Sequence, residues 1–183
     1  MKRWLSSFSL FELVLISSVA AMGIAVKPII TPLVHLITGP LFIPGGSVGG
    51  GIYMMFIVIA VLLIPKGGVA TLACIIQAIM AISTGVIGGH GFMSLFTYIL
   101  PGIVMDIMRF VTRKSQVGAF EAFLIGGFGN LAGTYAANLV FFRLPLIPLA
   151  LSLTAGLLSG GFGGMLANQM VKPLRILLKE GKI

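Results

Sequence analysis

The residues of this sequence that could do chemistry are polar side chains placed in or beside long apolar runs. They are Tyr53, Gln77, Thr84, Tyr98, Asn130, Tyr135 and Asn138, together with His35, His90 and Arg143 in the stretches that join the runs. Polar groups at membrane depth are costly and mark binding sites or pathways by default. Amides, phenols and imidazoles can hold a small molecule by hydrogen bonds and aromatic contact. We therefore predict that these residues bind a substrate.

Simpler roles remain open for parts of this set. A threonine in an apolar helix often bonds to the backbone of its own helix, which would account for Thr84. A tyrosine near a membrane surface often serves as an interfacial anchor. Asn138 and Gln77 are harder to explain in this way, because a buried amide has several hydrogen-bonding groups to satisfy.

Enzymatic and metal chemistry find little support in the sequence. His35, His90 and Cys74 lack the spacing of metal ligands and lie at different expected depths. The sequence has no phosphate-binding loop and no closely spaced pair of catalytic acids. We therefore expect no catalytic residue, no metal site and no cofactor. Any energy for transport must come from another protein or from an ion gradient.

The elements that must position these residues are membrane helices. Of the 183 residues, 58% are hydrophobic and 9% are charged, whereas charged residues make up about 25% of ordinary soluble domains. A crossing needs about 20 apolar residues, so six crossings nearly use up the length. We predict an all-α membrane protein with one six-helix domain spanning residues 1–183. The expected helices cover residues 10–26, 47–64, 69–87, 92–111, 119–142 and 146–171.

A connection rich in proline and glycine follows the first expected helix. Proline cannot easily continue a helix, so Lys27 and Pro28 are expected to end it. Residues 28–46 form a long connection, and residues 38–51 read TGPLFIPGGSVGGG before the second apolar run. Irregular backbone cannot face hydrocarbon unpaired. We therefore predict that this long loop is extracellular and closes over a solute site as its lid and wall.

The basic residues divide unevenly between the two expected sides of the membrane. Six crossings put both termini on one side, which collects ten Lys and Arg residues and leaves Lys27 and Arg143 on the other. The excess of basic residues on cytoplasmic loops then places both termini in the cytoplasm. This division accounts for the net charge of +8 without nucleic acid. No acidic residue is expected in the outer cavity, which leaves neutral or anionic ligands open, with Lys27 or Arg143 near the rim.

Small residues mark where membrane helices can pack closely. Two runs expected to pack inside the bundle are Gly126, Gly129 and Gly133 on the fifth helix and Gly156, Gly160 and Gly164 on the sixth. The first helix carries Ser17, Ala21 and Ala25 at four-residue spacing. This stripe could pack inside the bundle or bind a helix of a partner subunit.

Topology, charge and several local sequences together resemble the substrate-binding S components of energy-coupling factor (ECF) vitamin transporters. The sequence AMGIA at residues 21–25 fits the AxxxA docking motif of that family. Further matching stretches are GPLFIPGGSVGG (39–50), PKGGVATL (65–72), LPGIVMDIMRFVTRK (100–114) and LSGGFGGMLA (158–167). The resemblance implies a non-enzymatic subunit in a bacterial cell membrane that captures a vitamin or vitamin precursor outside. It also implies a transmembrane coupling subunit of the EcfT type and two ATPase subunits as partners.

Within the family, the layout most resembles the YkoE-like branch, which implies thiamine or hydroxymethylpyrimidine as the ligand. That branch shows acidic and tryptophan residues around its ligand, whereas this chain has Gln77 in the third helix and Trp4 as its single tryptophan. A neutral pyrimidine therefore fits more easily than thiamine. The alternative function is a self-sufficient secondary carrier or channel for a small solute. Such carriers often have two related halves, and residues 1–90 and 91–183 show no convincing repeat.

Overall fold

The computed structural model of the chain describes residues 7–41, 43–85, 93–112 and 117–179. Its helices are α2 (Leu10–Thr38), α3 (Gly45–Leu63), α4 (Val69–Thr84), α5 (Met93–Thr112), α6 (Ala119–Ala137) and α7 (Leu146–Lys179). A 3-10 turn, η1 (Gly39–Leu41), follows α2, and a π-helical turn, η2 (Asn138–Phe142), follows α6. The described residues contain no strand, so the all-α prediction is confirmed.

Several of these helices are long and apolar enough to cross a membrane. In the part of the chain that the structure describes, there are four: α2, α3, Leu95–Thr112 of α5 and Leu146–Ile176 of α7. Helix α4 is apolar but has only 16 residues. These helices support a multi-pass membrane protein. Six crossings and the cytoplasmic position of the termini stay predictions.

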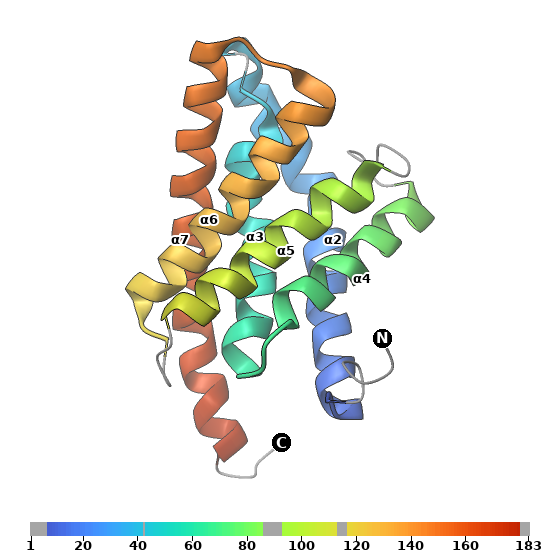
Figure 1. Cartoon of the computed structure of the whole chain (residues 1–183), viewed down its shortest axis with the longest axis vertical. Helices are drawn as coiled ribbons and strands as arrows, with labels where there is room; N and C mark the ends of the chain where they lie inside the picture. The colour runs from blue at the N-terminus through green and yellow to red at the C-terminus, as the bar shows by residue number, and fades with distance from the viewer. Residues whose placement is uncertain (1–6, 42, 86–92, 113–116, 180–183) are drawn as a thin grey trace.

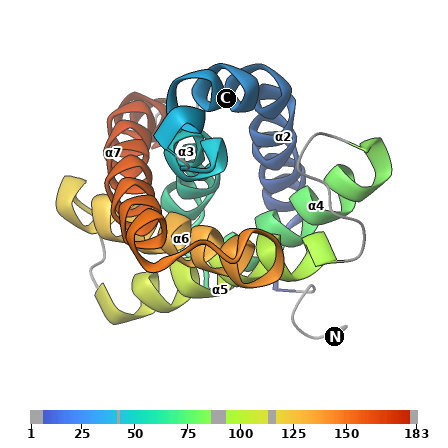
Figure 2. The same ribbon diagram turned by 90° about the horizontal axis from the view of Figure 1, so that it is seen from above.

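The expected long loop between the first two helices is wrong. Helix α2 continues through Pro28 and Pro32 as far as Thr38, and α3 already begins at Gly45. Each proline removes one backbone N–H from the helical ladder, but prolines four residues apart put both gaps on the same side of the helix. The remaining turns continue, and Figure 2 shows the later part of α2 arcing toward the start of α3. The connection is therefore short, comprising residues 39–44.

The last helix is also longer than the sequence predicts. Helix α7 passes through Pro173 and ends at Lys179, whereas residue 171 was the expected end. Arg175, on the added turns, donates a hydrogen bond of 2.6 Å to the carbonyl oxygen of Leu62. That oxygen belongs to the last turn of α3, where helical carbonyls lack helical partners. The first turn of α2 and the last turn of α7 lie at the same end of the bundle (Figure 1).

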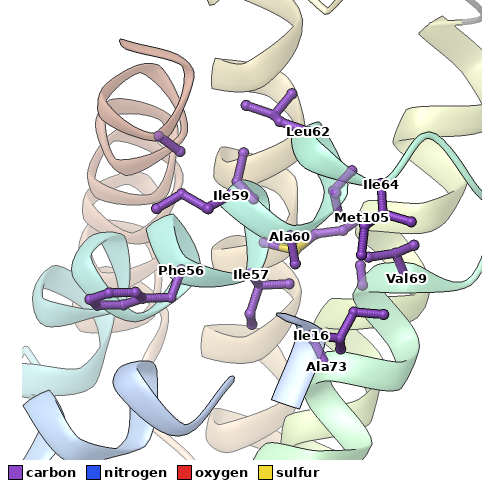
Figure 3. Close-up of a cluster of buried hydrophobic side chains, with 14 of the residues drawn as sticks. Ile16, Phe56, Ile57, Ile59, Ala60, Leu62, Ile64, Val69, Ala73 and Met105 are labelled. Atoms are coloured by element: carbon purple, nitrogen blue, oxygen red, sulfur yellow. The ribbon is translucent and has the colours of Figure 1, made fainter. Parts of the chain in front are cut away.

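Helix α3 forms the centre of the hydrophobic core. It runs between α2 and α7 and packs heavily against both. Its buried side chains include Ile57 and Val58, which meet Ile16 of α2 and Met105 of α5 in one cluster (Figure 3). This cluster joins α3 to the first half of α2 and to α4 and α5.

The predicted packing of the glycines of α6 and α7 inside the bundle is confirmed. A Cβ atom added to Gly126 would lie 3.1 Å from the Cα of Gly164 and would overlap the carbonyl oxygen of Gly160. A Cβ on Gly164 would in turn overlap the carbonyl oxygen of Ala122. Only residues without a side chain let the two backbones approach this closely.

Each described carboxylate accepts hydrogen bonds from backbone N–H groups at the start of a helix. Glu12 accepts a hydrogen bond from the backbone N–H of Ser9 at 2.8 Å and pairs with Lys66 Nζ at 2.6 Å. Glu121 accepts from the backbone N–H of Gly118 at 2.9 Å. Asp106 of α5 reaches the first turn of α4, where helical N–H groups lack helical partners. None of these three carboxylates lines the cavity described next.

Candidate substrate-binding site

A cavity of about 520 Å³ lies between the helices and borders the hydrophobic cluster, since Ile57 and Cys74 belong to both. Every one of α2 to α7 contributes to its wall. The glycine-rich start of α3 forms part of the wall through Gly45, Gly46 and Gly50. The predicted role of this stretch as a wall agrees with its position, but it is helical rather than a loop.

A lysine and two tyrosines lie together in the wall. The Lys27 ammonium donates a hydrogen bond to the Tyr98 hydroxyl, and its Nζ lies 4.0 Å from the centroid of the Tyr98 ring and 5.0 Å from that of Tyr53. The Tyr53 and Thr31 hydroxyl oxygens are 2.5 Å apart and share a hydrogen bond. The faces of both rings attract the cation. Nevertheless, all of these partners are neutral.

Two buried amides use the backbone of neighbouring helices as partners. Gln77 Nε2 of α4 donates to the carbonyl oxygen of Ala20 at 3.2 Å, beside Gly23, where a Cβ would overlap the amide. Asn130 Nδ2 of α6 donates to the carbonyl oxygens of Ser47 at 2.9 Å and Gly156 at 2.8 Å. Asn130 therefore joins α3, α6 and α7 at the wall of the cavity.

Two hydroxyl groups in the wall are buried and have no partner. Thr134 of α6 is 9% exposed and Ser152 of α7 is 0% exposed, and neither hydroxyl oxygen makes a hydrogen bond. Thr134 lies one turn after Asn130, and Gly156 lies one turn after Ser152. A Cβ on Gly156 would lie 2.8 Å from Thr134 Oγ1 and 3.8 Å from Asn130 Nδ2, which places these polar groups together. A buried unpaired hydroxyl costs free energy, so this part of the wall suits a molecule that supplies the missing partner.

Half of the residues predicted to bind substrate line this cavity. They are His35, Tyr53, Gln77, Tyr98 and Asn130. Their contribution to binding stays a prediction, although the fold brings them together from α2, α3, α4, α5 and α6.

The other predicted binding residues do not line the cavity or lie outside the described residues. The Thr84 hydroxyl donates to the carbonyl oxygen of Met80, the simpler role weighed above. Tyr135 is 45% exposed on the outer face of α6. Asn138 Oδ1 accepts from the backbone N–H of Leu144 at 2.8 Å, and Arg143 ends η2 in the left-handed region with φ of 45°. These two residues therefore shape the turn before α7, and His90 lies outside the described residues.

The sequence analysis missed residues on the later part of α2. Lys27 was placed at the rim because the helix was expected to end there, yet it lines the cavity together with Thr31. Lys27, Thr31 and His35 follow each other at four-residue spacing, which puts them on one face of a continuous helix. This spacing was a signal that the helix continues through Pro28 and Pro32.

The small-residue stripe of α2 lies at the surface of the described structure. Ser17 and Ala25 are exposed and Ala21 is half-buried. Large apolar side chains on the same helix are also exposed, including Val14 at 56% and Met22 at 54%. The stripe is therefore available to a partner helix, and its use as a docking surface stays a prediction.

Three comparisons place the chain among known proteins. Residues 11–132 match the family described as "ABC-type cobalt transport system, permease component". A crystal structure described as an S-component of an ECF transporter has the same fold, with a TM-score of 0.73 and 22% sequence identity over 91% of this chain and 84% of that one. No curated protein matches the sequence. The chain thus belongs to the family of ABC-type cobalt transport system permease components, and its fold is that of an ECF S-component.

Proposed function

We propose that this chain is the substrate-capturing membrane subunit of an ECF-type ABC importer. It binds a vitamin or vitamin precursor on the extracellular side and delivers it inward with a coupling subunit of the EcfT type and two ATPase subunits. The observation that carries this proposal is the cavity of about 520 Å³ walled by all the helices of an S-component fold. Its volume lies in the range of about 300–1,000 Å³ that is typical of small-molecule sites.

In this proposal the solute and the coupling subunit bind to separate surfaces of the chain. The cavity binds the solute, and Ser17, Ala21 and Ala25 on the outer face of α2 bind the coupling subunit. Small side chains let two helix backbones approach in a membrane, where no hydrophobic force drives association. The proposed orientation in the bacterial cell membrane has both termini in the cytoplasm, because the basic residues gather on that side.

The sequence resemblance and the family description suggest three ligands, which should be tested first. The resemblance to the YkoE-like branch suggests thiamine and hydroxymethylpyrimidine, and the family description names cobalt. Thiamine and a cobalt ion are cations, which the Lys27 ammonium in the wall would repel. Among the described residues, no group of three or more His, Cys, Asp and Glu residues could hold a metal ion. The wall therefore favours an organic ligand without positive charge.

The proposed function is tested with the full chain purified in detergent and reconstituted in liposomes. We expect native mass spectrometry to detect a retained small molecule, and we expect the chain alone to bind solute without accumulating it. Uptake should require the coupling subunit, both ATPases and ATP. If the chain alone moved solute at full rate along an ion gradient, it would be the self-sufficient carrier of the alternative hypothesis.

A further inference from the structure

Two parts of the cavity wall carry polar groups that lack a partner in the described structure, the Lys27 ammonium a negative charge and the Thr134 and Ser152 hydroxyls a hydrogen bond. We propose that the cavity takes a small organic acid, whose carboxylate pairs with Lys27 and whose second polar group bonds to Thr134 and Ser152. This inference rests on the proposed function and names the chemical class of its ligand.

Lys27 forms no ion pair among the described residues. This residue lies well inside α2, a helix of 29 residues that is long enough to cross a membrane. A cation at such a depth is costly unless a group of opposite charge accompanies it. Its partners are the Tyr98 hydroxyl and the faces of the Tyr53 and Tyr98 rings, which stabilise the ammonium but do not cancel its charge.

None of the described carboxylates lies in this wall. The sequence has four acidic residues, Glu12, Asp106, Glu121 and Glu180. Glu12, Asp106 and Glu121 bind the starts of helices, away from the cavity, and Glu180 lies outside the described residues, directly after α7. The described wall therefore holds a cation and no anion, so the compensating negative charge is expected to come from the ligand.

On α6 and α7 the wall needs hydrogen-bond partners rather than a charge. The hydroxyls of Thr134 and Ser152 are buried in the wall and unpartnered, while Asn130 beside them already donates both amide hydrogens. A hydroxyl can both donate and accept a hydrogen bond. A ligand with a hydroxyl, amide or ring nitrogen at its second end would satisfy these groups. A purely hydrocarbon acid would leave them unpaired.

The test compares acids with their uncharged analogues on the full chain in detergent. Suitable probe pairs are nicotinate with nicotinamide, pantothenate with panthenol, and biotin with biotinamide, and binding is measured by thermal shift and calorimetry. We expect at least one acid to bind more tightly than its analogue. Lys27→Met should weaken the binding of that acid about 30-fold and abolish the preference. The control Lys172→Met changes an exposed lysine of α7. It should leave the affinity for the acid and the preference over its analogue unchanged.

The second arm uses Thr134→Val and Ser152→Ala. Removing an unpartnered buried hydroxyl should leave the melting temperature of the ligand-free protein unchanged or raise it, because its desolvation penalty disappears. The same changes should weaken binding of the acid about fivefold each. The control Thr154→Val removes an exposed hydroxyl that donates to Ala150 and should not affect binding. A residue with a purely structural role would not combine an unchanged or higher melting temperature with weaker binding of the acid.

The possible outcomes separate this inference from the proposed function. If no acid binds more tightly than its analogue, or if Lys27→Met leaves the preference intact, the inference is overturned. Binding of thiamine, hydroxymethylpyrimidine or Co²⁺ in place of every acid also overturns it but leaves the proposed S-component function in place. Independent transport by the chain alone would overturn the proposed function itself.

Discussion

The ammonium nitrogen of Lys27 lies 4.0 Å from the centre of the Tyr98 ring and donates a hydrogen bond to the hydroxyl of the same tyrosine. One tyrosine thus offers the cation both its ring face and its oxygen. The two residues come from α2 and α5 and are 71 positions apart in the chain. This contact therefore links the helix that carries the proposed docking stripe to α5 within the cavity wall.

Tyr98→Phe tests this contact by removing the oxygen and keeping the ring. A hydrogen bond to a charged group contributes about 1.5–3 kcal/mol, so we expect the free energy of unfolding of the ligand-free protein to fall by an amount of that order. Chemical denaturation in detergent measures it. The matched control is Tyr135→Phe, which removes a hydroxyl from a tyrosine that is 45% exposed and does not line the cavity. Equal losses in the two variants would contradict the contact.

Asn130→Asp tests the junction of α3, α6 and α7. The substitution replaces two hydrogen-bond donors by a carboxylate that faces the carbonyl oxygens of Ser47 and Gly156. Because a charged group is left buried among acceptors, we expect a loss of about 2–4 kcal/mol of unfolding free energy. Gln169→Glu is the same change of amide to acid at an exposed position beside Lys172, and it should be neutral. A stable Asn130→Asp variant would show that the junction is not essential.

Asp106→Ala tests the packing of α5 against the start of α4. Asp106 accepts hydrogen bonds from the backbone N–H groups of Ala70 at 3.2 Å and Thr71 at 2.8 Å, and from the Thr71 hydroxyl at 2.6 Å. Since these backbone groups have no helical partner, we expect a loss of about 1–3 kcal/mol in thermal or chemical unfolding. Thr71→Val removes one of the three bonds and should cost less than Asp106→Ala. The reverse order would contradict this assignment.

Gly164→Ala tests the close approach of α6 and α7. The added Cβ would overlap the carbonyl oxygen of Ala122, so the two helices must separate. Overpacking of this kind costs about 1–3 kcal/mol, and we expect a lower melting temperature together with a lower yield of monodisperse protein. In Gly67→Ala the Cβ meets nothing within 4 Å, and the variant should behave as the unchanged protein. Similar melting temperatures and yields of the two variants would contradict the close approach of α6 and α7.

Replacing Ala21 and Ala25 together by Trp tests the proposed docking surface. The large rings should prevent a partner helix from approaching the stripe, so we expect co-purification with the coupling subunit to be lost. Solute binding should persist because neither residue lines the cavity. Leu36→Trp, at a position of α2 that is 77% exposed but away from the stripe, should still assemble. Loss of solute binding with assembly intact would refute this division of surfaces.

Much of this fold can be predicted from the sequence, because the apolar runs mark the helices and the glycines mark where helices pack closely. The expected starts of α4 and α6 agree with the structure at Val69 and Ala119. The prediction was wrong at Pro28 and Pro32, because a propensity against proline does not decide the outcome when the remaining turns of a helix are supported by packing. Contacts of Lys27 with Tyr53 and Tyr98 depend on that continuation. The signal for this part of the site was the four-residue spacing of Lys27, Thr31 and His35, which the rule against proline in helices outweighed.

The length of α7 has a mechanical consequence. Its 34 residues extend about 51 Å at about 1.5 Å per residue, and even a tilt of about 40° would leave it longer than a hydrocarbon layer of about 30 Å. Its final turns, which carry Arg175, are fastened to the end of α3 at Leu62. Because the hydrogen bond from Arg175 joins the last turns of α7 to one end of α3, a displacement of these turns would also displace α3, whose first turn lines the cavity.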